Sequence, residues 1–186
     1  MSARRQGGWA GAGRGARGWL RGFTLIELIA VLILVGIVSA VAVPALNRLS
    51  RTGAAAAAAD VAADLNFARA RAMATGSTSW VVFDVSGDAY SVLAEPQASP
   101  GRANAVTVIN PGTGAAMVRR LNRNEFAGVD LLTASFTGDA EVGFDWLGRP
   151  VRSTGVFHDV QGLVTLTEGW QVTVEARTGV ARAVKP

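Results

Sequence analysis

The sequence has no cysteine and only one histidine, His158, among its 186 residues. Disulfide bridges are therefore excluded, and stability must come from a packed core, for which 49% apolar residues supply the material. A zinc or catalytic centre needs several converging ligands, and a lone histidine does not provide them. No glycine loop of the phosphate-binding type occurs either. We expect no enzyme, no cofactor and no metal site, and we expect His158 to be structural.

Charge is scarce in one long stretch of the chain. From Phe23 to Val43, twenty-one residues contain a single charged side chain, Glu27. A helix that spans a bilayer needs about 20 mainly apolar residues, so this stretch is predicted to be a transmembrane helix. A carboxylate costs about 2.5–3.5 kcal/mol at the centre of such a helix and less near its end. Either Glu27 stays hydrated at the headgroup level, or it pairs with a positive charge at the N-terminus of a neighbouring copy.

Acidic residues are absent from residues 1–22, which contain five arginines. The isoelectric point of about 10.9 reflects this segment, because its removal takes the formal net charge from +4 to about −1. Residues 1–22 have too little apolar surface to fold and are predicted to be a basic leader peptide that is removed. Positive charge beside a spanning helix stays on the cytoplasmic side. We therefore expect a single-pass protein with a cytoplasmic N-terminus and a C-terminal domain that faces the periplasm or the outside.

The leader, Gly22 and the run Phe23-Thr24-Leu25-Ile26-Glu27-Leu28 resemble the class III signal of type IV pilins and type II secretion pseudopilins. The resemblance implies that a prepilin peptidase cleaves between Gly22 and Phe23 and N-methylates Phe23. It also implies that Glu27 contacts the N-terminal amine of an adjacent subunit during filament assembly. It further implies a protein of the bacterial inner membrane with a periplasmic C-terminal domain. Pro44 falls where many pilins carry a proline and is predicted to kink the helix without ending it.

Helical character continues through residues 44–75 and is predicted to stop at Gly76-Ser77. Asp60 and Asp64, one turn apart, indicate either a solvated face or a patch for a partner. At 3.6 residues per turn, one stripe is expected to pack against a globular domain: Ala54, Ala57, Val61, Leu65, Ala68 and Ala72.

After Gly76 the apolar pattern becomes strand-like, with a tight hairpin predicted at Glu168-Gly169. The predicted fold class is α+β and type IV pilin-like, with a long N-terminal helix packed on an antiparallel β-sheet domain of roughly seven to nine strands. The predicted segments are the leader 1–22, the transmembrane helix 23–43, its amphipathic continuation 44–75 and the β domain 76–186. The strands are expected at 79–85, 89–95, 106–109, 117–121, 129–132, 141–145, 163–167, 170–177 and 180–184.

Three further features resemble minor pseudopilins of the GspH/FimT type. They are the Ala-Arg-Ala-Arg-Ala run at residues 68–72, Phe144 and Gly148. The resemblance implies a minor pseudopilin, a structural subunit of the type II secretion pseudopilus. One alternative is a minor pilin of a type IV pilus, acting in pilus assembly or DNA uptake. A second is a conventionally secreted binding module whose signal is cleaved after small residues at 39–42.

Some minor pilins of that type bind DNA through a Gly-Arg-x-Arg element near the C-terminus. Here Gly179-Val180-Ala181-Arg182 lacks the first arginine. Arg149, Arg152, Arg177 and Arg182 could form a weak patch for DNA or a partner, but we favour dispersed, solvated arginines in a near-neutral domain. The expected partners are other pseudopilins or pilins, the prepilin peptidase and the inner membrane, with nucleic acid less favoured.

Overall fold

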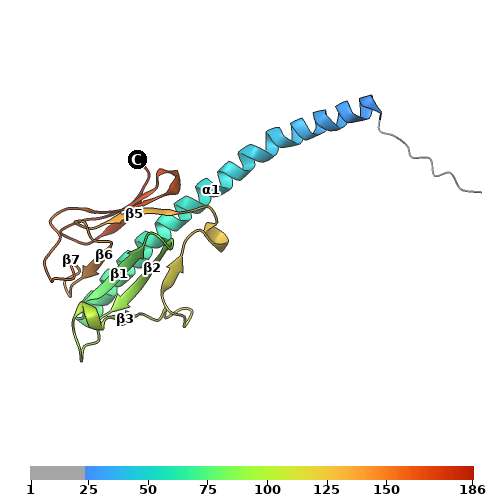
Figure 1. Cartoon of the computed structure of the whole chain (residues 1–186). Coiled ribbons are helices and arrows are strands. Elements are labelled where there is room, and N and C mark those ends of the chain that lie inside the picture. The colour runs from blue at the N-terminus through green and yellow to red at the C-terminus, as the bar shows by residue number, and fades with distance from the viewer. Residues whose placement is uncertain (1–23) are drawn as a thin grey trace, which may run out of the picture. The chain divides into compact units, whose positions relative to one another are not determined.

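The computed structural model describes the fold of residues 24–186, and the side chains in that range except those of residues 41–51. The chain divides into two compact units between Ala42 and Val43. Among the described residues, the α-helix α1 runs from Leu25 to Thr75 and contributes to both units (Figure 1). The predicted leader and the predicted cleavage site Gly22-Phe23 lie outside the described residues.

Helix α1 ends where the sequence predicts. Gly76 adopts a φ of 68°, a conformation that glycine reaches without steric cost, and its N–H donates to the Ala72 carbonyl at 2.9 Å. The predicted packing stripe is confirmed, because all six of its residues are fully buried: Ala54, Ala57, Val61, Leu65, Ala68 and Ala72.

The larger sheet has six strands and is antiparallel throughout (Figure 1). Its path is β3-β2-β1-β6-β7, and β4 also pairs with β2, so β3 and β4 share one edge of that strand. The strands are β1 (Ser79–Asp84), β2 (Ala89–Ala94), β3 (Val106–Thr107), β4 (Val118–Arg120), β6 (Glu141–Phe144) and β7 (Pro150–Val151).

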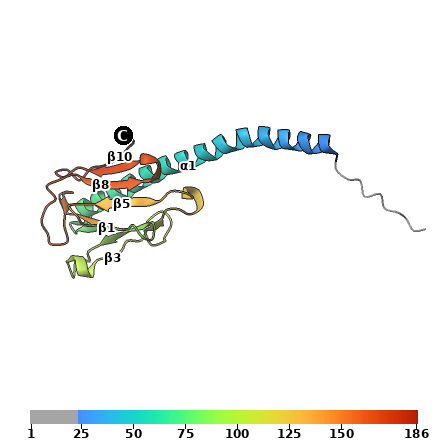
Figure 2. The same ribbon diagram turned by 45° about the horizontal axis from the view of Figure 1, so that its top comes forward.

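The smaller sheet has four antiparallel strands in the order β10-β9-β8-β5 (Figure 2). They are β5 (Leu131–Ser135), β8 (Gly162–Leu166), β9 (Gln171–Val174) and β10 (Ala181–Val184). Short 3-10 turns complete the domain: η1 (Arg102–Asn104), η2 (Asn124–Phe126) and η3 (Thr167–Gly169).

One hydrophobic core joins the two sheets to the second part of α1. Leu65 of α1 packs in the same cluster as Phe144 of the larger sheet and Val164 of the smaller one. The alanines of the buried stripe have little side-chain volume, so the backbone of α1 can approach both sheets closely. The predicted arrangement of a long helix packed on an antiparallel β domain is confirmed.

The strand predictions are close, with local errors. The described residues form ten strands, one more than the upper prediction, because β7 was not expected. The strand predicted at 129–132 is displaced to Leu131–Ser135. The hairpin at Glu168-Gly169 is confirmed. The two residues have φ values of 61° and 75°, and positive φ values are those of tight turns that match the twist of the flanking strands.

Candidate functional site

The first turn of α1 is capped by its own sequence. The Glu27 N–H donates to the Thr24 hydroxyl oxygen at 3.2 Å, so Thr24 satisfies a backbone donor that the helix leaves free. Thr24 and Glu27 stand three residues apart, which is the spacing of a capping box. The carboxylate of Glu27 also lies where the helix dipole favours negative charge. Glu27 is exposed, so its side chain is accessible to a partner.

The first part of α1 exposes large apolar side chains on every side. All described residues from Thr24 to Ala40 are exposed, and the large apolar ones between Leu25 and Val38 have exposed fractions of 45 to 76%. Contiguous apolar surface of this kind marks a contact with a membrane or another protein.

Taken over the described residues alone, none of the helices combines the length and the apolar character that a membrane crossing requires. The predicted span Phe23–Val43 stays a prediction.

Arg69 of α1 holds together two turns that are far apart in the sequence. Its Nε donates to the Thr178 carbonyl at 2.6 Å and to the Gly148 carbonyl at 3.2 Å. A Cβ atom at Gly179 would overlap the Gly148 carbonyl oxygen and lie 3.1 Å from the Phe144 ring. Arg69, Phe144 and Gly148, which belong to the GspH/FimT-type resemblance, therefore meet at one place, where Arg69 attaches the late turns to α1.

The four arginines of the predicted patch differ in their surroundings. Arg149 pairs with Asp145 at 2.7 Å and lies over the Phe157 ring, and Arg152 pairs with Asp139 at 3.0 Å. Arg177 and Arg182 are exposed. Two of the four positive charges are thus offset by acids of the same chain. This reduces the net positive charge with which the four arginines could attract a polyanion.

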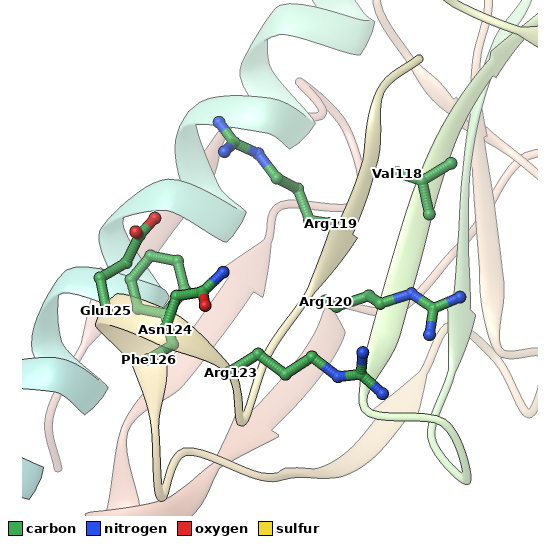
Figure 3. Close-up of a pocket in the computed structure, with 7 residues that line it drawn as sticks. All are labelled: Val118, Arg119, Arg120, Arg123, Asn124, Glu125 and Phe126. Atoms are coloured by element: carbon green, nitrogen blue, oxygen red, sulfur yellow. The ribbon is translucent and has the colours of Figure 1, made fainter. Parts of the chain in front are cut away.

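A second group of arginines lines a surface pocket of about 550 Å³ between β4 and η2 (Figure 3). This site was not predicted from the sequence, although three arginines within five residues are a visible signal. The lining residues are Val118, Arg119, Arg120, Arg123, Asn124, Glu125 and Phe126.

A buried network fixes one side of this pocket. The Asp64 carboxylate accepts hydrogen bonds from the Tyr90 hydroxyl at 2.8 Å and from Arg119 Nε at 3.3 Å. Burial, reinforced by that carboxylate, raises the pKa of the Tyr90 hydroxyl far above its ordinary value. Asp64 itself is buried, so the solvated face suggested for it is wrong, and Asp64 anchors β2 and β4 to α1.

His158 is buried, with its Nδ1 atom 2.8 Å from the Thr137 hydroxyl and its ring edge against Phe136. Burial, and then the nearby charge of Arg152, lower the pKa of the His158 imidazole, so the ring is neutral in the fold at pH 7. Across residues 24–186, no group of three or more histidine and acidic side chains is placed to hold a metal ion.

Comparison with known proteins finds a match to the N-terminal segment and a match to the fold. Residues 21–43 match the prokaryotic N-terminal methylation motif. Two solved structures of the minor pseudopilin EpsH from the type 2 secretion system of Vibrio cholerae match with a TM-score of 0.53 and 14% sequence identity. The matches cover 72% and 73% of this chain, and 96% and 97% of the EpsH chains. No curated protein sequence matches the chain.

The chain thus combines an N-terminal methylation motif with a fold similar to that of solved minor pseudopilin structures. Its fold is similar to that of the minor pseudopilin EpsH, which confirms the type IV pilin-like fold that the sequence predicts.

Proposed function

We propose that this protein is a minor pseudopilin, a structural subunit of a type II secretion pseudopilus. One observation carries the proposal: a methylation motif at residues 21–43 stands on the same chain as a domain with the fold of EpsH. The motif supports processing by a prepilin peptidase, and the fold supports assembly with other pilin-like subunits. The proposed role is assembly, not catalysis.

Processing comes first in the proposed mechanism. The peptidase cleaves after Gly22 and methylates the new N-terminus at Phe23. The apolar segment then anchors the protein in the inner membrane with its β domain in the periplasm. The large exposed apolar side chains from Leu25 to Val38 support this step, because the described residues of the chain leave them uncovered.

Glu27 then guides entry into the filament. Spanning helices pack side by side, and the Glu27 carboxylate offsets the positive N-terminal amine of a neighbouring subunit. An unpaired carboxylate among apolar helices is costly, so a subunit in the correct register is favoured over a displaced one. The exposure of Glu27 supports this role.

The test is filament entry in cells that produce the complete secretion machine. The wild-type chain, Glu27→Ala, Glu27→Gln and the apolar control Ile33→Leu are expressed at equal levels, and filaments sheared from the cells are probed by immunoblotting. We expect at least a tenfold loss for both Glu27 variants, since each removes the charge, and no loss for the control. Normal entry of Glu27→Ala would remove the role assigned to the carboxylate.

Deletion of the gene that encodes this protein distinguishes a type II secretion machine from a type IV pilus. We expect folded proteins that normally reach the medium to accumulate in the periplasm. Loss of pilus-dependent motility or DNA uptake with normal secretion would instead identify a type IV pilus subunit.

A further inference from the structure

The pocket between β4 and η2 contains two arginines that form no ion pair within the described residues. Arg119 is occupied, because it is bound to Asp64 and its side chain extends toward α1 (Figure 3). Arg120 and Arg123 are exposed, and no acidic side chain of residues 24–186 forms an ion pair with either. Within this short segment, Arg119 is therefore structural, whereas Arg120 and Arg123 are available to a ligand.

The geometry gathers those two charges on one side. Arg120 and Arg123 extend in the same direction, away from α1, whereas the Glu125 side chain extends toward α1 (Figure 3). The one acid of the pocket therefore does not neutralise them. Asp84, whose pKa Arg120 helps to lower, is held by the Ser86 hydroxyl at 2.7 Å and by the Gly87 N–H.

Paired guanidinium groups recognise carboxylates or phosphates through parallel hydrogen bonds. The limited extent of the positive charge favours a carboxylate ligand on a protein over a nucleic acid or a membrane. Residues 52–186 contain eleven arginines and lysines and thirteen acids, so this part of the chain has a net charge of −2. Nucleic acids and anionic membranes are bound by extended basic surfaces, whereas this near-neutral domain offers two arginines in one small pocket.

The position of the pocket suits a contact between subunits. Turn η2 lies against α1 near Gly53, where an added Cβ would be 3.7 Å from the Glu125 carbonyl oxygen. The pocket thus lies beside the helix, close to the end of its buried stripe at Ala54. In a filament built from packed helices, surfaces beside the helix face neighbouring subunits.

We propose that Arg120 and Arg123 bind the carboxylates of an acidic surface segment on a neighbouring pilin-like subunit. This inference rests on the proposed function. Arg119 acts as a positioning residue, which holds β4 on α1 through Asp64 and so fixes the direction of Arg120. Asn124 adds an uncharged donor beside the two arginines.

The binding test uses the full chain in detergent micelles and three probes: a hexaglutamate peptide, inorganic phosphate and a duplex DNA oligonucleotide. Arg120→Glu and Arg123→Glu are compared with Lys185→Glu, an exposed control that changes the charge equally. We expect salt-sensitive peptide binding that weakens at least fivefold in each pocket variant and less than twofold in the control. Equal peptide binding by all variants, or binding of DNA or phosphate alone through these arginines, would overturn the proposal.

A second measurement places the contact in the filament. A photo-crosslinking residue replaces Asn124 in cells with the complete machine, and mass spectrometry maps the crosslinked peptide. We expect a peptide of another subunit that contains at least two acids, with a yield reduced fivefold or more by combining Arg120→Glu and Arg123→Glu. Filaments that contain the wild-type chain but give no such crosslink would refute the pocket proposal alone. Absence of the wild-type chain from filaments would refute the proposed function itself.

Discussion

The two parts of α1 use apolar residues in opposite ways. Between Leu25 and Val38 the helix carries large leucine, isoleucine and valine side chains, and these are exposed. Between Ala54 and Ala72 it presents mostly alanines, and these are buried beneath two sheets. The large apolar side chains therefore lie where no other described residue covers them, and the small side chains lie where the helix is buried.

The difference indicates two separate kinds of partner. A close contact with a folded domain needs small residues, because large ones would hold the sheets away from the helix. A contact with lipid needs apolar surface in every direction. The first partner is the β domain of the same chain. The second, in the proposed function, is the membrane and then the filament.

The largest effect is expected from adding bulk to the second part. Ala68→Phe should destabilise the full chain by about 3 kcal/mol or more, since the side chain is fully buried and the core must shift to admit a ring. Denaturant unfolding in detergent measures the change. The matched variant Ala63→Phe, at an exposed position, should change stability by less than about 0.5 kcal/mol. Leu32→Ala in the first part should also leave the unfolding midpoint unchanged.

A smaller loss is expected where Arg69 attaches the late turns to the second part of α1. Gly179→Ala should cost about 2–3 kcal/mol, because the new methyl group overlaps the Gly148 carbonyl at a φ of 67°. Gly169→Ala is the control, since its φ is 75° but no atom lies near the added methyl group. We expect about 1 kcal/mol there. Equal losses at the two glycines would show that close packing at this attachment is unimportant.

Tyr90→Phe should cost about 1 kcal/mol, because it removes one hydrogen bond to Asp64 and leaves the bond from Arg119. Tyr90 is the only tyrosine, so tyrosinate absorbance reports on it alone. Its pKa is raised in the fold, so this hydroxyl contributes stability that is fully present below about pH 10 and is lost as the pH rises further. Ionisation near pH 10 in the folded protein would contradict the buried network.

The smallest effect concerns the only histidine. The pKa of His158 is lowered in the fold, so the unfolded chain binds the proton more tightly, and stability should fall as the pH decreases below about 6.5. His158→Asn should flatten this dependence between pH 7.5 and 5.5. Unfolding curves over that range test the prediction, and an unchanged pH dependence in the variant would contradict it.

Local sequence signals predicted the helix and most strands. Gly76 identified the end of α1, and the spacing of the alanines identified its buried face. The register of β5 could not be read locally, because it is set by pairing with β8 and is interrupted between Leu131 and Thr133. Strand β7 was missed because it has only two residues and begins with Pro150, which cannot donate a hydrogen bond.

Candidate functional residues could be predicted from the sequence only where they belong to a contiguous motif. The run from Gly22 to Glu27 predicted the methylation motif that residues 21–43 match, because all of its residues are contiguous in the sequence, and processing itself stays a prediction. The roles of the arginines depend on distant partners: Asp64 is 55 residues from Arg119, and Asp139 is 13 residues from Arg152. Clustering in the sequence therefore showed where positive charge gathers, but not which arginines the fold neutralises.

The central claim is that the first part of α1 becomes the N-terminus of an assembled, membrane-anchored subunit. Mass spectrometry of the N-terminal peptide of the protein extracted from membranes tests it most directly. The proposed function predicts a peptide that begins with N-methylated Phe23 and contains Glu27. A chain that begins near Val43, as a conventional secretory signal would leave it, would contradict the claim.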